Sequence, residues 1–480
     1  MKKSTIIMTT FLIGAFFTFL NETLLNIALT KIMTVFHVDA PTVQWLATGF
    51  MLVMGVLMPL SATIIQWFTT RQLFIGLMSI FLIGTLVAGC AVNFPMLLAG
   101  RMIQAAGTGL LIPVIMNAML LLFPPYERGK VMGNFGLVMM FAPAIGPTLS
   151  GVIVDTLGWR WLFFAVVPFV VFSIGFAFKY LDNVGEVTKP KIDIFSVVLS
   201  TIGVAGIIYG FSSVGNIEGG FSNKAVFLPI VIGVISLIIF IYRQNHLTSP
   251  LLDMSVFKYS NYSKGMFIFV VVVMAMFASE IVMPMYLQGP MGFSAKVAGM
   301  ILLPGALLNG AMSPVMGRIF DKIGPRKMII PGMFVLTLVM IFYSTIHPGI
   351  PLYIFIIVYM VLMVSISMIM MPSHTNAINQ LPKHLYPHGT AIGNMIQPIA
   401  GAMGISVFVS IMTHGQQNAL EGISNPTHSQ AQAALTYGVH HAYWFAIALT
   451  LIGLITALFI TRSKAPEGET FGLPEEQNQI

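Results

Sequence analysis

The sequence has very little charge for its length. Asp, Glu, Lys and Arg make up 8% of its 480 residues, whereas hydrophobic residues make up 57%. A soluble domain carries about 25% charged residues, and a chain with so few cannot cover a water-facing surface. The composition therefore excludes a soluble enzyme, a disordered protein and a nucleic-acid-binding domain, and it predicts an integral membrane protein.

Other scarce features narrow the chemistry. The single cysteine, Cys90, excludes a disulfide framework and any Cys-based metal site. The ten His residues show no metal-binding spacing, and no Walker P-loop occurs. We therefore expect no metal site, no cofactor and no ATP hydrolysis.

Long apolar runs are abundant instead. Fourteen runs are long enough for a transmembrane helix of about 20 residues, and none alternates in polarity as a β-barrel strand would. No cleavage site follows the first run, so we interpret it as a span and not as a signal peptide. The fold class is all-α and polytopic, with expected spans at 4–27, 43–65, 73–92, 96–122, 131–154, 160–180, 194–213, 225–243, 265–288, 296–317, 327–346, 351–375, 388–413 and 441–461.

The positions of the basic residues predict the orientation. With a cytoplasmic N-terminus, 18 of the 23 Lys and Arg lie in inner segments, Lys322 among them, while Arg101 falls inside a span. The 4 in outer segments are Lys31, Arg160, Lys224 and Lys296. Short loops on the cytoplasmic side carry such an excess of positive charge. We therefore expect both termini in the cytoplasm and an even number of spans.

The chain also repeats itself. Residues 59–71 share a frame with 314–326, and 128–134 share one with 388–394. Parallel halves around a central path are typical of transporters, whose site lies near the midplane between the halves. The predicted organisation is a six-helix bundle at 1–185, a linker with two extra helices at 186–259, a second six-helix bundle at 260–462 and a tail at 463–480.

Three ionisable residues lie inside the expected spans. They are Glu22, Arg101 and Glu280, and such residues generally line a pathway or pair with each other. The repeat offset places Glu22 and Glu280 at similar depth in the two halves, and a desolvated carboxylate can take up a proton and release it again. The alternative is that the carboxylates cap helix ends and that Arg101 extends to the outer headgroups.

Six blocks of the sequence resemble motifs of the major facilitator superfamily. Phe19–Leu29 is similar to the first-helix motif, although the family often has Asp where Asn21 stands. Arg101 with Gln104 resembles the fourth-helix motif. The other four blocks are Ala142–Gly151, which is like the fifth-helix signature of exporters, Gly317–Lys327, which is like the loop between the second and third helices of a half, and the subfamily blocks Trp159–Phe163 and Ser249–Phe257.

The sequence is identified as similar to the fourteen-span drug:proton antiporter-2 family, and within it to the lincomycin-resistance (Lmr-type) multidrug exporters of Gram-positive bacteria. The resemblance implies alternating access and exchange of amphipathic drugs for protons across the bacterial plasma membrane, driven by the proton gradient without a cofactor. It implies no enzyme activity and no nucleic-acid partner, and we expect a monomer in the lipid bilayer.

The expected site residues form two sets. The first serves proton coupling and substrate binding, and comprises Glu22, Asn26, Arg101, Gln104 and Glu280. The second serves the conformational change, and comprises Gly146, Pro147, Gly151, Gly317, Asp321, Gly324, Arg326 and Lys327.

Two other functions stay open on this scaffold. One is the export of an endogenous lipid, siderophore or metabolite, and the other is a receptor or scaffold that does not transport. Residues 414–440 are expected to form the longest outer segment, rich in Gln, Asn and Ser but without Lys or Arg. His440 and His441 are expected to start the last helix at the outer interface.

Overall fold

The structure, a computed structural model, describes residues 3–122, 125–181, 183, 187, 193–214, 222–247, 250–382, 385–423 and 427–462. The predicted tail at 463–480 lies outside these residues, as do Lys2, Lys189, Lys191, Lys383 and Lys464 from the basic-residue census. The described part is helical and contains no strand, which confirms the expected all-α class.

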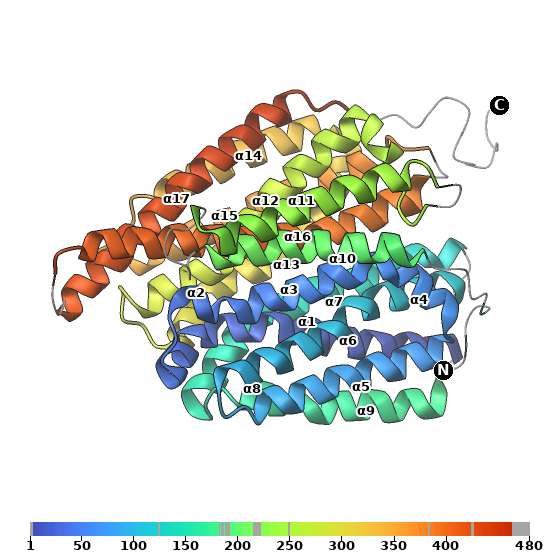
Figure 1. Cartoon of the computed structure of the whole chain (residues 1–480), viewed down its shortest axis with the longest axis horizontal. Helices are drawn as coiled ribbons and strands as arrows, with labels where there is room; N and C mark the ends of the chain where they lie inside the picture. Colours follow the sequence, from blue (N-terminus) through green and yellow to red (C-terminus); the bar gives the residue numbers. More distant parts are fainter. Residues whose placement is uncertain are drawn as a thin grey trace, which may run out of the picture.

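Long helices run side by side along the molecule, and the described chain begins and ends toward the same end of it (Figure 1). The first half contains α1 (Lys3–Phe36), α2 (Ala40–Val43), α3 (Trp45–Leu57), α4 (Ser61–Trp67), α5 (Thr70–Gly89), α6 (Phe94–Leu122), α7 (Pro125–Thr156), α8 (Trp161–Phe164) and α9 (Val167–Tyr180). The extra pair is α10 (Ile194–Ser213) and α11 (Lys224–Gln244). The second half contains α12 (Ser260–Gln288), α13 (Ala295–Ile323), α14 (Arg326–Tyr343), α15 (Leu352–Ile378), α16 (Tyr386–Leu420) and α17 (His428–Leu458).

The expected spans have counterparts in these helices. Thirteen stretches of the described chain are long and apolar enough to cross a membrane. The remaining expected span, 131–154, lies within α7, a helix of 32 residues with several side chains outside the description. At about 1.5 Å per residue, α7 is longer than a hydrocarbon core of about 30 Å.

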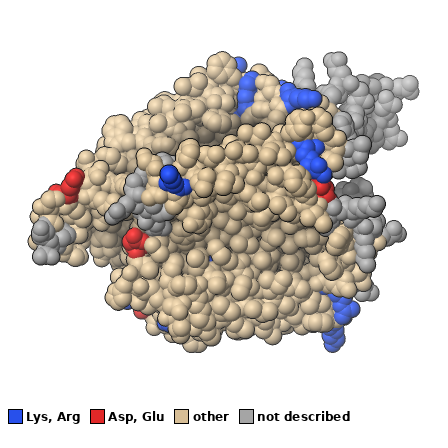
Figure 2. Space-filling model, viewed as in Figure 1, with Lys and Arg blue, Asp and Glu red and all other residues tan. Residues whose placement is uncertain are grey.

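The surface agrees with a membrane environment. A wide band without Lys, Arg, Asp or Glu separates the two ends of the molecule on the face in Figure 2. Large apolar side chains such as Phe172, Ile238 and Trp444 are exposed, at 58–62%. Such a continuous apolar surface is unfavourable in water and favourable against lipid tails.

Pro59 interrupts the second expected span, at 43–65. It stands inside a short 3₁₀ turn at Met58–Leu60, between α3 and α4. Proline has no N–H to donate to the preceding turn, which explains why the helical hydrogen bonding changes there.

The segment 414–440, which we expected to be the longest outer segment, is largely helical. α16 continues to Leu420 and α17 already begins at His428, so His440 and His441 lie inside the last helix and not at its start. Thr427 caps α17 by a reciprocal pair of hydrogen bonds with Gln430. The two helices extend beyond the apolar run as a hairpin at the left of Figure 1, because a helix needs no apolar sequence where it leaves the membrane.

The first helix shows the same effect. α1 continues to Phe36, nine residues past the expected end of its span at residue 27. Lys31, which we expected in an outer connecting segment, therefore lies on α1. The apolar runs located the helices correctly and underestimated the lengths of several.

α10 covers the line along which α3 of the first half meets α16 of the second. The Ser212 Oγ of α10 lies 2.6 Å from the Ser406 Oγ of α16, while the Gln44 side chain beside α3 donates to the Ser212 carbonyl oxygen at 3.3 Å. A Cβ on Gly55 would touch both Val204 and Ile399 at 3.3 Å. α10 therefore contacts both halves at once.

Candidate functional site

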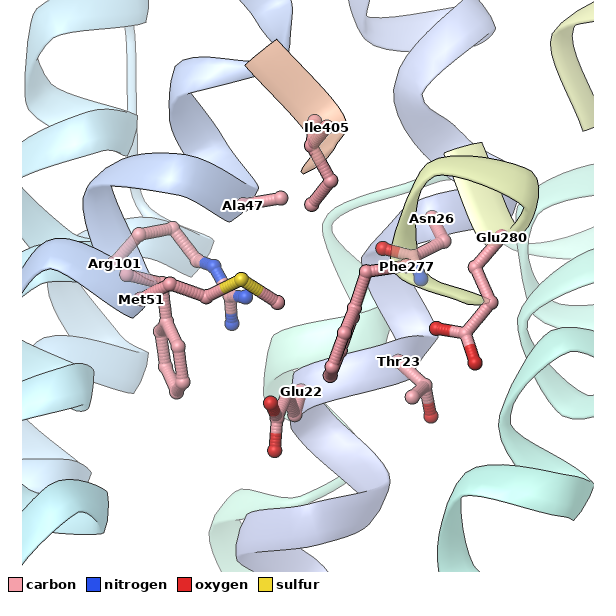
Figure 3. A pocket seen from close by; sticks show the side chains of 10 residues that line it. Glu22, Thr23, Asn26, Ala47, Met51, Arg101, Phe277, Glu280 and Ile405 are labelled. Carbon is pink, nitrogen blue, oxygen red and sulfur yellow. The ribbon is translucent and has the colours of Figure 1, made fainter. Parts of the chain in front are cut away.

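A small cavity lies between the two halves and contains the charged residues of the spans (Figure 3). Its lining comes from five helices and consists of Glu22, Thr23, Asn26, Ala47, Phe50, Met51, Arg101, Phe277, Glu280 and Ile405. The free space among these side chains is about 10 Å³, which is about the space of one water molecule. In this conformation, the cavity is too small for a drug.

Four of the five residues expected for coupling and binding lie together in this lining. They are Glu22 and Asn26 of α1, Arg101 of α6 and Glu280 of α12. The fifth, Gln104, lies one turn after Arg101 on α6 and contacts it directly. The chain therefore brings these expected residues into one place, although their individual roles stay predictions.

Arg101 is buried and held by neutral groups. Its side chain is 1% exposed, and its Nη1 donates to Asn21 Oδ1 at 2.8 Å and to Gln104 Oε1 at 3.0 Å. The guanidinium also lies 4.3 Å from the centroid of the Phe50 ring, a favourable cation–π position. Among the described residues, no carboxylate forms an ion pair with Arg101 at 4.0 Å or less.

The polar contacts of Arg101 continue into the first half. Gln104 Nε2 donates to Thr85 Oγ1 of α5 at 2.8 Å, and both side chains are fully buried. Arg101 and Gln104 lie three residues apart, which places them on one face of α6. The resulting chain of hydrogen bonds from Asn21 through Arg101 and Gln104 to Thr85 joins α1, α6 and α5.

The two glutamates lie on different sides of an aromatic ring. Phe277 stands between Glu22 and Glu280, with Asn26 and Thr23 on the Glu280 side (Figure 3). Glu280 Oε2 is buried and has no hydrogen-bond partner among the described residues. An unpartnered buried carboxylate oxygen is costly, so a proton, a water molecule or a cation at this position would stabilise the site.

The expected exporter signature lies where α7 meets α1 and α13. A Cβ on Gly146 would collide with Thr23 Oγ1, next to Glu22, and a Cβ on Gly151 would lie 2.5 Å from the Ala295 carbonyl oxygen. Pro147 supplies the carbonyl oxygen that Gly299 of α13 approaches. Small residues permit such close contacts between membrane helices.

Polar contacts close the same end of the interface between the halves, where α7 ends and α13 begins. Lys296 N donates to Asp155 Oδ2 at 2.8 Å, and Thr148 Oγ1 donates to the Gly299 carbonyl oxygen at 3.1 Å. Between the first helices of the two halves, Gln288 Nε2 of α12 donates to the carbonyl oxygen of Ile27 in α1 at 3.1 Å. The structure is therefore closed at the predicted outer end.

The expected loop motif lies outside the cavity. Gly317 is on α13, Gly324 follows the last residue of α13, and Arg326 and Lys327 are exposed in the first turn of α14. Asp321 is also on α13, but its side chain lies outside the described residues. The conformational role of this motif stays a prediction.

A separate ion pair joins the extra helices. Arg243 Nε and Nη2 donate to the Asp193 carboxylate at 2.8 and 3.0 Å. These hydrogen bonds, together with one from Ser196, lower the pKa of Asp193 to about 2. The pair fixes the start of α10 against the end of α11.

Sequence reasoning missed several residues of the site. It treated Asn21 only as a departure from a motif, it named Phe277 only among the apolar surroundings of Glu280, and it assigned no site role to Thr85 or Phe50. Thr85 and Asn21 are polar residues inside apolar runs, a signal that could have identified them. The aromatic residues gave no such signal because the chain has 37 Phe.

Comparisons with known proteins find relatives of this chain. The profile of the Major Facilitator Superfamily matches residues 11–405. The chain is 46% identical to the Lincomycin resistance protein LmrB of Bacillus subtilis (strain 168), over 95% of this chain and 96% of that protein. It is 43% identical to the protein of the same name from Listeria monocytogenes serovar 1/2a, over 95% of this chain and 97% of that one.

Solved structures show the same fold. A bacterial homolog of the human lysosomal transporter Spinster, in an inward-facing and unoccupied conformation, superposes with a TM-score of 0.70. The alignment covers 96% of this chain and 98% of that one at 11% sequence identity. At this identity, the similarity concerns the fold alone.

Proposed function

Because the chain belongs to the major facilitator superfamily and is a multi-pass membrane transporter rather than an enzyme, we propose that it exports lincomycin-like and other amphipathic drugs in exchange for protons. The names of its relatives support the drug class. The observation that carries the proposal is the cavity between the halves, where one carboxylate from each half and a buried Arg101 meet an apolar, aromatic wall.

The proposed mechanism is alternating access. The contacts of α7 with α13 and of α1 with α12 close one end of the interface. The cavity becomes accessible from that end only when these contacts break. We propose that this end faces outward, that both termini are cytoplasmic, and that the transporter works as a monomer without a cofactor.

The proton gradient supplies enough free energy for this exchange. Each proton that enters down a potential of 100 mV releases about 2.3 kcal/mol. Since a tenfold concentration ratio corresponds to about 1.4 kcal/mol, one proton supports a gradient of roughly fifty-fold for a neutral drug.

We assign different tasks to the two glutamates. Glu22 is next to Asn21, the hydrogen-bond partner of Arg101, on α1. A change in the charge of Glu22 therefore acts electrostatically on the hydrogen-bonded side chains of the first half. Glu280 lies beside Phe277 and has an unpartnered oxygen, which suits a cationic drug. Glu22 is then the obligatory proton carrier, and Glu280 favours cationic substrates.

The test measures efflux of one neutral and one monocationic drug from energised cells, with and without an ionophore. Glu22→Gln should abolish uphill efflux of both drugs. Glu280→Gln should weaken transport of the cation selectively, by about 1–3 kcal/mol if a charge-assisted contact is lost. Glu421→Gln is the matched control because Glu421 is exposed after α16, outside the cavity lining.

Four outcomes would contradict parts of this assignment. Full activity of Glu22→Gln on both drugs would exclude Glu22 as the proton carrier, and equal losses in both variants would show that the acids act as one unit. Efflux that is insensitive to the ionophore would exclude proton coupling. A deletion strain with normal drug tolerance and altered extracellular metabolites would point to an endogenous substrate instead.

A further inference from the structure

Thr85 of α5 ends the hydrogen-bonded chain that starts at Arg101. Its side chain is 0% exposed, and its Oγ1 accepts a hydrogen bond from Gln104 Nε2 at 2.8 Å. The same Oγ1 donates to the carbonyl oxygen of Phe81, one turn earlier on α5, at 2.7 Å. Thr85 is therefore an acceptor and a donor at once, although it does not belong to the lining of the cavity.

This chain of hydrogen bonds is complete in one direction only. A guanidinium has donors and no acceptor, so Arg101 Nη1 requires the oxygen end of the Gln104 amide, which it bonds at 3.0 Å. The NH2 end of the amide then faces Thr85, whose oxygen must accept and whose O–H must donate elsewhere. The Phe81 carbonyl oxygen, which can only accept, receives that hydrogen bond. Thr85 thus favours the one amide orientation that suits Arg101.

Gln104 depends on this hydroxyl group because its side chain is fully buried. Without the hydroxyl, the NH2 group would lose the acceptor that it now has, and a buried donor without a partner is strongly unfavourable. The amide would then turn or shift toward another acceptor. An amide that has turned presents its NH2 end to the guanidinium, and two donors cannot bond each other.

Glycines bring α5 close enough to α6 for these contacts. A Cβ on Gly84 would lie 2.5 Å from Gln104 N, and a Cβ on Gly107 would lie 2.6 Å from the Leu77 carbonyl oxygen. Any larger residue at these positions would push the two backbones apart. The close contact means that the hydrogen bonds tie Arg101 to the backbone of α5 as well as to its own helix.

One nitrogen of Arg101 remains for the cavity. Nε donates to the Leu46 carbonyl oxygen at 3.4 Å, and Nη1 donates to Asn21 and Gln104. Nη2 donates to no group in the described part of the chain, and the side chain extends from α6 toward the middle of the cavity (Figure 3). Glu22 belongs to the same lining, and a guanidinium forms strong hydrogen bonds with an ionised carboxylate.

We propose that Thr85 is a positioning residue for proton coupling, which orients the Gln104 amide and thereby holds the Arg101 guanidinium at the cavity wall. The inference rests on the proposed function, in which Glu22 carries the proton, and it adds a residue that touches neither the proton nor the drug. A cation fixed near Glu22 stabilises its carboxylate when the proton leaves toward the cytoplasm. A displaced guanidinium stabilises the carboxylate less, so the proton is released more slowly.

The test removes the hydroxyl group and keeps the shape of the side chain. Thr85→Val, Thr85→Ser and the unmodified protein are reconstituted into vesicles. Two rates are measured for one neutral drug, namely exchange at equal pH and uphill transport driven by acid on the outer side.

Thr85→Val should affect the two rates differently, because the drug contacts proposed for Glu280 and Phe277 come from α12 of the second half. We expect exchange to stay within about twofold of the unmodified protein, while uphill transport falls by about tenfold, the effect of one lost charge-assisted bond. Thr85→Ser keeps the hydroxyl group and should stay within about twofold of the unmodified protein in both rates.

A second variant tests whether Thr85 acts through Gln104. Gln104→Leu removes the amide and should likewise lower uphill transport by about tenfold while exchange is retained. The double variant should lose no more than Gln104→Leu alone, because Thr85 then has no amide to orient. Losses that multiply to about a hundredfold would show two independent roles and overturn the proposal.

Thr450→Val is the matched control. Thr450 of α17 is also 0% exposed, and its Oγ1 donates to the carbonyl oxygen of Ala446, one turn earlier, at 2.8 Å, so the substitution removes a similar local bond far from Arg101 and should change neither rate. Unchanged uphill transport by Thr85→Val, or no recovery with Thr85→Ser, would overturn the proposal. Equal loss of exchange and uphill transport by Thr85→Val would show that the hydroxyl group is structural only.

The same rates test the proposed function separately. If the unmodified protein exchanges drug but ignores the pH gradient, the proposed function has failed, and the positioning role of Thr85 fails with it. That result comes from the unmodified protein alone and is therefore distinct from every outcome of the variants.

Discussion

Arg101 is a buried cation whose closest hydrogen-bond partners are amides. A charge removed from water needs several hydrogen bonds to be tolerated, and Asn21 and Gln104 provide the shortest of them. Because Asn21 is neutral, the positive charge is not cancelled locally. Glu22 and Glu280 are the carboxylates in the same cavity lining, so the field of Arg101 acts on whichever of them is ionised.

Arg101→Lys should therefore impair transport although it keeps the charge. A lysine has one nitrogen and no planar guanidinium, so it cannot bond Asn21 and Gln104 through one nitrogen, bond the Leu46 carbonyl oxygen through another and keep a flat group over the Phe50 ring. The loss of one charge-assisted bond alone corresponds to about tenfold. Drug efflux at matched membrane expression measures the effect. The control is Arg160→Lys, because Arg160 bonds the Ala91 carbonyl oxygen outside the cavity. Equal efflux by Arg101→Lys and the unmodified protein would contradict a role for this geometry.

The Asp193–Arg243 pair predicts a narrow pH effect on stability. The folded pKa of Asp193, about 2, lies below the ordinary value of about 3.9. The pair therefore stabilises the fold fully above about pH 4, and its contribution is lost as the pH falls toward 2. Thermal unfolding in detergent should show a constant difference between the protein and Asp193→Asn from pH 5 to 8, which shrinks below pH 4. A difference that varies between pH 5 and 8 would show that other groups titrate with the pair.

At the scale of helices, α7 and α13 depend on small residues for their contact. Gly151 of α7 meets the backbone of Ala295 and Lys296, and Gly299 of α13 meets Pro147. Membrane helices gain little from burying apolar side chains against each other, so close packing contributes much of their association. This contact therefore determines how firmly the predicted outer end is closed.

Gly151→Val should open that end. The added side chain collides with the backbone of α13, which cannot move aside as a flexible side chain can. In a Cys90→Ser background, Ala47→Cys in the cavity lining should react faster with an impermeant thiol reagent applied to intact cells. Gly175→Val is the control, because a Cβ on Gly175 of α9 meets nothing within 4 Å. Slower or unchanged labelling would mean that this contact does not close the cavity.

At the scale of the whole molecule, the sequence predicted the positions of the spans and the three charged residues of the cavity. Both predictions depend on the high free energy of charge in a bilayer, which makes Glu22, Arg101 and Glu280 conspicuous. The helix ends beyond the bilayer, such as Leu420 and His428, could not be predicted in this way because no apolar pattern marks them.

The detailed partners could not be predicted either. A step of one residue rotates a side chain by about 100° on a helix, so the bond from Arg101 to Asn21 depends on helix rotation that the sequence does not reveal. The aromatic wall of Phe50 and Phe277 likewise results from how five helices meet. Packing between helices, and not the pattern along any one of them, decides these contacts.

The predicted orientation has a direct test. In a Cys90→Ser background, Gly422→Cys between α16 and α17 should react with an impermeant reagent in intact cells. Lys322→Cys at the end of α13 should react only after the cells are permeabilised, because the basic-residue census places it inside. The reverse pattern would show that the molecule has the opposite orientation in the membrane, and that transport runs in the opposite direction.

The position of α10 makes the two sides of the molecule unequal toward the surrounding lipid. Two lines of contact between the halves face the bilayer, one at α3 and α16 and the other at α7 and α13. α10 covers the first, and Ser212 is bonded to both of its sides, whereas within the described chain neither α10 nor α11 packs against α7 or α13. A molecule dissolved in the hydrocarbon and diffusing laterally toward the cavity is therefore blocked from one direction, and its access from the membrane is confined to the other.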